Sequence, residues 1–95
     1  MFTDSHCHLN FLELQSRLPE IREAMAAARV TRALCICTTM EEFGDVHQLA
    51  LDPDNFWATV GVHPDTEHMT EPSVGDLVER AALARVVAIG ETGLD

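Results

Sequence analysis

Two histidines near the amino-terminus, His6 and His8, are separated by a single residue. In an extended chain, side chains two residues apart lie on the same face, so both imidazoles can approach one cation. Histidine is the commonest protein ligand for zinc-like metals. Asp4 lies two residues before His6, so its side chain is expected on the same face, where it could orient one of these ligands. The spacing fits a metal site, and it also fits two ordinary polar residues near a strand end.

Two further polar residues follow apolar runs. Glu91 comes directly after residues 86–90, where a carboxylate needs a counter-charge, hydrogen bonds or solvent. Its two oxygens could bridge two cations, or the side chain could simply face water. His63 follows the run that begins at residue 56, and it could bind a phosphate or act in acid–base chemistry. A loop histidine bonded to a backbone carbonyl is the alternative.

These four residues share a position in the predicted fold. Apolar runs and helical stripes alternate along the chain in the order βαβαβαβ, which predicts parallel strands joined by right-handed crossovers. Ligands of such sheets and barrels bind at the carboxyl ends of the strands. The candidate residues follow the first, third and fourth strands, so we expect them to meet at one edge.

The elements that must position them are read from periodicity. Strands are predicted over residues 1–6, 32–38, 56–62 and 86–90. Helices are predicted over residues 18–29, from the capping residue Thr39 to a point before Pro53, and over 73–84 with Ser73 as N-cap. Their predicted buried faces are Leu18, Ile21, Met25 and Ala28; Phe43, Val46 and Ala50; and Val74, Leu77, Val78 and Ala81.

Composition limits the class of protein. The 95 residues, 46% of them hydrophobic, suffice for one small domain, and the chain ends directly after a strand, as a truncated domain would. Three cysteines without CxxC spacing indicate buried free thiols rather than disulfides. We see neither a signal peptide nor an apolar run long enough for a membrane, and therefore expect a cytoplasmic protein without a membrane partner. His47 and His68 are expected at the surface.

The net charge of −10 arises from sixteen acids and six arginines, with no lysine. Proteins that bind nucleic acid usually present a basic face. A nucleic-acid substrate would therefore require bound metal cations or basic residues outside this chain. The oligomeric state has no signature in the sequence.

The motifs resemble those of a known family. Segments 4–9 (DSHCHL), 61–64 (GVHP) and 90–95 (GETGLD) have the order and spacing found in the TatD family of metal-dependent deoxyribonucleases. The resemblance extends over the whole chain. Any single motif is weak, because other amidohydrolase-like barrels also open with HxH, but the three together are specific. Asn10 and Asp65 depart from the family pattern without touching a matched ligand.

The resemblance implies the amino-terminal part of a (β/α)8 TIM barrel, with four parallel strands and three intervening helices in residues 1–95. It implies two divalent metals, Mg, Mn or Zn, at the mouth of the complete barrel. His6 and His8 would bind the first metal, and Glu91 would bridge both and be the catalytic carboxylate. His63 would bind substrate. The remaining ligands, two histidines and an aspartate, come from later strands.

Two functions follow as expectations. The first is hydrolysis of ester bonds in DNA, which the resemblance implies to be exonucleolytic, with C–N bond cleavage as a close chemical variant. The second is a non-catalytic half-barrel that binds metal weakly or packs against a partner. The missing later ligands favour the second function and predict that residues 1–95 alone are inactive.

Overall fold

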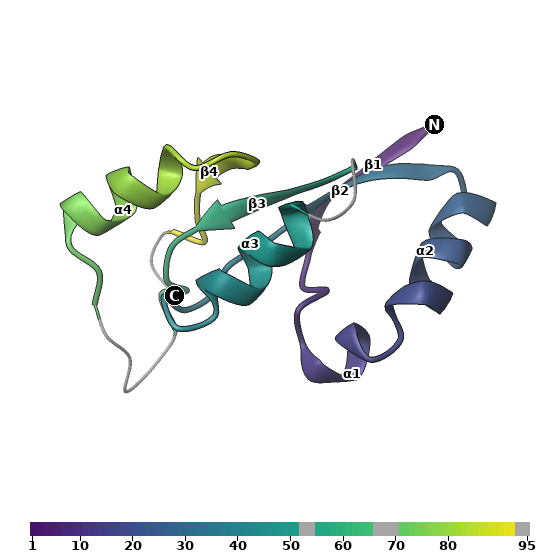
Figure 1. Ribbon diagram of the computed structural model, residues 1–95, viewed down its shortest axis with the longest axis horizontal. Helices are drawn as coiled ribbons and strands as arrows, with labels where there is room; N and C mark the ends of the chain where they lie inside the picture. Colours follow the sequence, from purple (N-terminus) through teal and green to yellow (C-terminus); the bar gives the residue numbers. More distant parts are fainter. Residues whose placement is uncertain (52–54, 66–70, 93–95) are drawn as a thin grey trace.

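Four parallel strands form the centre of the molecule in the computed structural model, which describes residues 1–51, 55–65 and 71–92 (Figure 1). They pair in chain order as one sheet, so all four carboxyl ends lie at the same edge. The predicted parallel arrangement is confirmed. The strands are β1 (Phe2–Cys7), β2 (Val30–Cys35), β3 (Phe56–Val60) and β4 (Val86–Ile89).

Helices connect the successive strands, as the periodicity predicted. They are α1 (Leu12–Gln15), α2 (Leu18–Ala27), α3 (Phe43–Leu51) and α4 (Val74–Ala81). Helix α1 was not predicted, because a four-residue helix is too short for an apolar period and its N-cap, Phe11, makes no side-chain cap bond. Ser73 is the N-cap of α4, as predicted, and forms a capping box with Asp76. Thr39 does not open α3 as predicted: its Oγ1 accepts the Glu42 N–H at 3.1 Å within a turn, and the helix begins four residues later, at Phe43.

One face of the sheet carries the core. Alternate strand residues on this face are buried against the helices, and α3 contributes the largest apolar surface from the helical side. The strand positions are Ala33, Cys35, Phe56, Ala58, Val60 and Val86, and the α3 positions are Phe43, Val46, Leu49 and Ala50. The buried face predicted for α3 is thus confirmed, with Leu49 added to it.

The opposite face of the sheet is open. Its side chains surround a shallow hollow of about 590 Å³ and come from all four strands. The lining residues are Thr3, Arg32, Leu34, Trp57 and Val87. The sheet therefore has one face packed on helices and a second that contacts no helix among the described residues.

The predicted buried faces of two helices need correction. In α4, Val74 and Val78 are 78% and 60% exposed, whereas Leu77 and Ala81 pack against the core. These four residues form two adjacent rows, each with a spacing of four, and only one row of so short a helix meets the sheet. Ala28 is also exposed, because α2 ends at Ala27 and Ala28 is its C-cap.

Candidate metal centre

The carboxyl edge of the sheet brings His6, His8 and Glu91 together. One ligand atom from each of these side chains lies within 4.8 Å of the others. His6 belongs to β1 and Glu91 follows β4, although β1 and β4 are the two outer strands of the sheet. Three strand spacings in a flat sheet would separate them by roughly 14 Å. The contact therefore requires the sheet to curl, which brings its first and last strand ends together.

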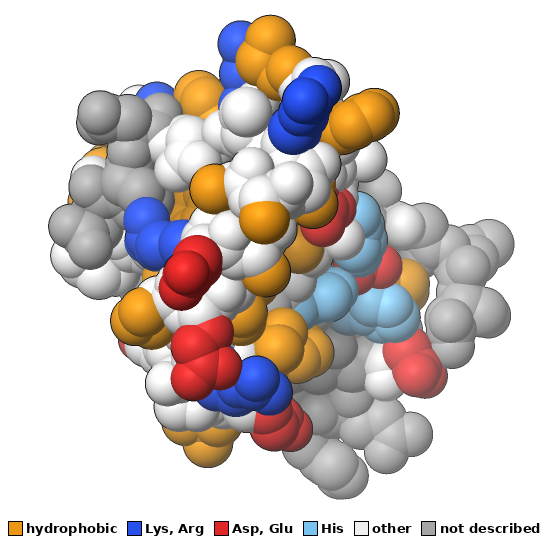
Figure 2. All heavy atoms as spheres, turned by 90° about the vertical axis from the view of Figure 1, so that its right-hand side faces the viewer, with side chains coloured by type: hydrophobic (Ala, Val, Ile, Leu, Met, Phe, Trp, Pro, Cys, Tyr) orange, Lys and Arg blue, Asp and Glu red, His pale blue; other side chains and the backbone are white. Residues whose placement is uncertain are grey.

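The Glu91 carboxylate lies at the centre of this group. Its Oε2 atom is 3.3 Å from His6 Nε2 and 3.9 Å from His8 Nε2. Its Oε1 atom is 3.3 Å from His63 Nε2. Histidine side chains accordingly gather on one face of the molecule beside acidic side chains (Figure 2). The two oxygens face different partners, with the HxH pair on one side and His63 on the other.

His63 is held with a defined ring orientation. Its backbone N–H donates to the Thr38 carbonyl at 2.8 Å, which ties the residue to the segment after β2. Its Nδ1 accepts the backbone N–H of Asp65 at 3.0 Å. In a neutral imidazole with Nδ1 as acceptor, the proton is on Nε2. His63 therefore presents an N–H donor to Glu91 Oε1.

Asp4 acts on the backbone rather than on an imidazole. Its carboxylate accepts the backbone N–H of His6 at 3.0 Å. The sequence predicted that Asp4 could orient a metal ligand, and the contact that the structure shows is with the main chain of β1 at His6. This contact still restrains the point from which the His6 side chain departs.

The His8 ring is positioned by aromatic packing. It stacks on Phe11, with centroids 4.8 Å apart and planes at 13°, and meets His6 edge-on at 5.0 Å. Its Nδ1 is buried and has no hydrogen-bond partner within the described part of the chain. Phe11 was not singled out from the sequence, because an aromatic residue after a strand has no spacing signature of its own.

The donor set fits a divalent cation. Two imidazole nitrogens and a carboxylate oxygen suit zinc-like metals, which they bind at about 2.0–2.2 Å. Two such atoms around a tetrahedral ion lie about 3.4 Å apart. The observed separations of 3.3 and 3.9 Å from Glu91 Oε2 are close to that value. Small side-chain movements would bring His6, His8 and Glu91 onto one ion.

The Cys37 thiol, one of three cysteines in the chain, does not supply a second reactive group. All three are free, and Cys7 Sγ lies 4.0 Å from Cys35 Sγ on the neighbouring strand. Burial raises the pKa of the Cys37 thiol, whose Sγ donates to the Thr39 carbonyl at 3.0 Å. A neutral buried thiol is a poor nucleophile, so Cys37 has no role in the chemistry of this edge.

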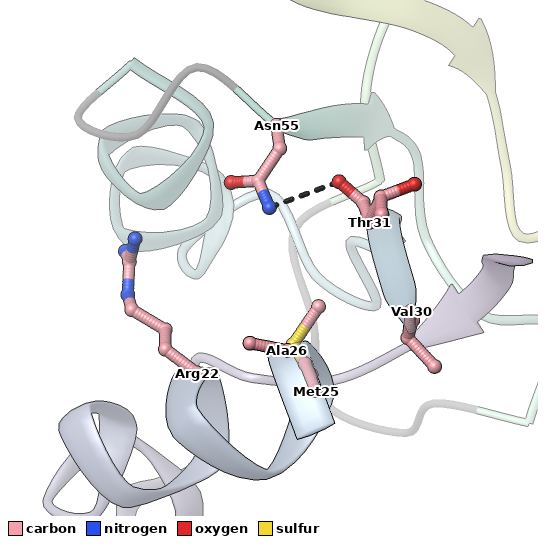
Figure 3. A pocket seen from close by; sticks show the side chains of 6 residues that line it. All are labelled: Arg22, Met25, Ala26, Val30, Thr31 and Asn55. Atoms are coloured by element: carbon pink, nitrogen blue, oxygen red, sulfur yellow. Dashed lines mark hydrogen bonds between the residues drawn. The ribbon is translucent and has the colours of Figure 1, made fainter. Parts of the chain in front are cut away.

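A cavity of about 290 Å³ lies at the opposite end of the sheet, between α2 and the amino ends of β2 and β3 (Figure 3). Asn55 donates to the Thr31 carbonyl at 3.0 Å on one side of it, and Arg22 is its only charged lining residue among those described. This cavity contains no pair of acid–base or metal-binding groups. The chemistry is therefore concentrated at the carboxyl edge.

The remaining histidines are partly accounted for. His47 was expected to be a solvated surface residue, but its ring stacks on Phe43 at 5.3 Å and its Nε2 lies 3.0 Å from the Ala84 carbonyl. It thus links α3 to the turn before β4. His68 and the last three residues of the third motif, 93–95, lie outside the described residues.

Comparison with known proteins identifies similar chains. A family model described as TatD related DNase matches residues 3–95. An uncharacterized metal-dependent hydrolase of Escherichia coli, YcfH, is 41% identical over 96 residues, covering 97% of this chain and 36% of the relative. The 3'-5' ssDNA/RNA exonuclease TatD of Citrobacter rodentium is 40% identical over 70 residues, covering 73% of this chain and 27% of the relative.

A solved structure gives the same result for the fold. The TatD homologue YjjV of Escherichia coli superposes with a TM-score of 0.84 at 29% sequence identity, covering 99% of this chain and 38% of that chain. The four parallel strands and their helices match the amino-terminal part of its TIM barrel. The chain spans little more than a third of the length of YcfH and YjjV. None of the described helices is long and apolar enough to cross a membrane.

Proposed function

This chain belongs to the TatD-related DNase family, and from that premise we propose that it forms the amino-terminal portion of a metal-dependent hydrolase domain that cleaves phosphodiester bonds in DNA. The proposed mode of cleavage is exonucleolytic. The relatives named as metal-dependent hydrolases, and one named as an exonuclease, support the reaction class.

The observation that carries the proposal is the two-sided environment of Glu91. One carboxylate oxygen faces His6 and His8, and the other faces His63. A carboxylate that only closed a surface ion pair would need a single partner. Here the carboxylate lies between a pair of imidazoles that can bind metal, which face Oε2, and a hydrogen-bond donor, which faces Oε1.

Each residue has a proposed role. His6 and His8 would hold the first of two divalent cations through Nε2, and Glu91 would share its oxygens between both cations. His63 would donate its Nε2 hydrogen to a phosphate oxygen, with Asp65 keeping the ring in the required tautomer. Two bound cations in such a site supply Lewis acidity, a lowered pKa for water and charge stabilisation of the leaving oxygen.

Charge supports the need for metal. The chain has a net charge of −10 and six basic side chains. It therefore repels a polyanion unless bound cations lie between them. Mg, Mn and Zn are the candidate ions, because carboxylate oxygens suit the first two and imidazoles suit the third. The proposed location is the cytoplasm, where a reducing environment keeps thiols such as these free.

The test uses the protein that carries these residues, freed of metal by chelation and reloaded with Mg, Mn or Zn. We expect shortening of end-labelled single-stranded and duplex DNA that EDTA abolishes. Glu91→Gln keeps the side-chain shape and removes the charge, so it should lose cleavage. His47→Gln, a histidine change away from the carboxyl edge, is the matched control and should cleave like the parent.

Three results would refute the proposal. Full cleavage by Glu91→Gln would exclude this carboxylate from the reaction. Metal binding without cleavage of DNA would leave the non-catalytic metal-binding function, and cleavage of an amide or cyclic C–N substrate instead would assign the amidohydrolase chemistry.

A further inference from the structure

We infer that Thr59 and Gly61 are positioning residues that set the location of Glu91 by fixing the backbone of Gly90. The inference rests on the proposed function, because it assigns Glu91 the role of a metal ligand. Both residues act through the residue that immediately precedes the carboxylate.

Thr59 is a buried polar residue in β3, 2% exposed, whose hydroxyl joins three strands. Its Oγ1 accepts the backbone N–H of Cys37 at 3.0 Å. A hydroxyl has one hydrogen to donate, and it donates this hydrogen to the carbonyl of Gly90 at 3.2 Å. Because Cys37 follows β2 and Gly90 follows β4, a single hydroxyl links the carboxyl ends of β2, β3 and β4.

Gly61 lies against the backbone of Gly90 and leaves no room there for a side chain. A Cβ atom at this position would overlap the Gly90 carbonyl oxygen and would lie 2.8 Å from the Gly90 carbonyl carbon. The three nearest atoms it would meet all belong to the Gly90 backbone, so moving a flexible side chain could not relieve these contacts. Any side chain at position 61 would therefore displace Gly90 and the residue attached to it.

Gly90 makes a third contact, a backbone hydrogen bond to strand β3. Its N–H donates to the Val60 carbonyl at 3.0 Å. The residue before Glu91 thus has its N–H bonded, its carbonyl bonded and one face in contact with Gly61. With that peptide fixed, the Glu91 Cα atom is fixed as well, and only the torsions of Glu91 itself determine where the carboxylate lies relative to His6, His8 and His63.

This arrangement separates positioning from general packing. Valine has the shape of threonine without the hydroxyl, so Thr59→Val retains the volume of the core and removes both hydrogen bonds of the hydroxyl, the one to Cys37 and the one to Gly90. Serine retains the hydroxyl and loses a methyl group. If the hydroxyl sets the Glu91 position, Thr59→Ser restores what Thr59→Val loses, whereas a packing role would give the opposite order.

The test measures metal affinity by calorimetry and the visible absorption of bound Co²⁺ in the protein that carries these residues. Groups that orient metal ligands typically change affinity by about 10–100-fold when removed. We expect Thr59→Val and Gly61→Ala to weaken binding within that range and to alter the Co²⁺ spectrum, and Thr59→Ser to resemble the parent. The control, Thr31→Val, loses a hydroxyl contact to the Phe2 carbonyl far from Glu91 and should bind like the parent.

Parental affinity and spectrum in Thr59→Val, while Glu91→Gln loses binding, would overturn this inference and leave the proposed function intact. Parental binding by Glu91→Gln itself would overturn both. Should Thr59→Val not fold, Thr59→Ser decides the question: parental affinity supports the role of the hydroxyl, and affinity lost in proportion to stability contradicts it.

Discussion

At the residue scale, the central feature is a carboxylate whose two oxygens have different neighbours. The strand-end position of Glu91 and the HxH spacing were sufficient to nominate three candidate ligands from the sequence. The sequence could not indicate that Oε1 faces His63 and Oε2 faces the HxH pair. That division depends on the curl of the sheet, which is a property of all four strands together.

The contacts behind the ligands were also beyond sequence reasoning. Thr59 and Gly61 look like an ordinary strand residue and an ordinary turn glycine until their distances to Gly90 are known. Asp4 was identified by parity, but its partner proved to be the backbone N–H of His6. Parity predicts the face on which a side chain lies and does not predict which atom it will bond.

His6 provides a direct test of a single ligand. His6→Ala removes one imidazole, so we expect metal affinity to fall by more than the roughly 10–100-fold typical of residues that only orient ligands. The melting temperature of the metal-free protein should change little, because residues at the carboxyl ends of barrel strands serve function more than stability. Calorimetric metal titration and thermal melting measure the two effects. Undiminished affinity would remove His6 from the ligand set.

Cys37 predicts a pH dependence of stability. Burial raises its pKa in the folded protein, whereas in the unfolded chain the thiol ionises near its ordinary value of 9.0. Its contribution to stability is therefore complete below pH 9.0 and is lost as the pH rises toward the folded-state pKa. Relative to Cys37→Ala, the unfolding free energy of the parent should fall above that pH by up to about 1.4 kcal/mol per pH unit. Urea unfolding of both proteins at several pH values measures this difference. If the unfolding free energies of the parent and Cys37→Ala change in parallel with pH, the prediction is wrong.

At the scale of elements, the order and type of the strands and main helices followed from periodicity, and their ends did not. Strand β2 begins at Val30 and ends at Cys35, two to three residues away from the predicted limits at each end. Local sequence sets apolar runs, but hydrogen-bond pairing with neighbouring strands decides where a strand stops. The exposure of Val74 and Val78 has a similar origin, because it depends on how α4 is rotated against β3 and β4.

The capping box of α4 predicts a measurable local effect. Ser73 Oγ accepts the Asp76 N–H at 3.0 Å, and Asp76 accepts the Ser73 N–H at 3.3 Å. Ser73→Ala removes the first of these bonds and should destabilise the protein by about 0.5–2 kcal/mol. The loss should appear first as faster amide exchange within α4. Ser16→Ala, at an exposed serine with a 3.5 Å contact, is the control. Equal exchange in both variants would show that the cap contributes nothing.

At the scale of the whole molecule, the sheet has one face buried by helices and one open. The open face exposes 60% of Val87 and includes Leu34 and Trp57 around a charged Arg32. In the matched YjjV structure the equivalent region is 38% of a longer chain.

This open face predicts how residues 1–95 behave when prepared alone. Exposed apolar surface of this kind favours association, and the unpaired edges of β1 and β4 favour it further. We expect light scattering to report particles larger than a monomer, and we expect no cleavage of DNA with Mg, Mn or Zn. A compact monomer with EDTA-sensitive cleavage would show that these residues suffice for the reaction.

The account depends above all on His6, His8 and Glu91 sharing one cation. Anomalous diffraction from crystals of the protein that carries these residues, grown with Zn²⁺ or Mn²⁺, tests this directly. The predicted result is an anomalous peak about 2.0–2.2 Å from His6 Nε2, His8 Nε2 and a Glu91 oxygen. A saturated protein whose anomalous peaks all lie away from these three side chains would contradict the account.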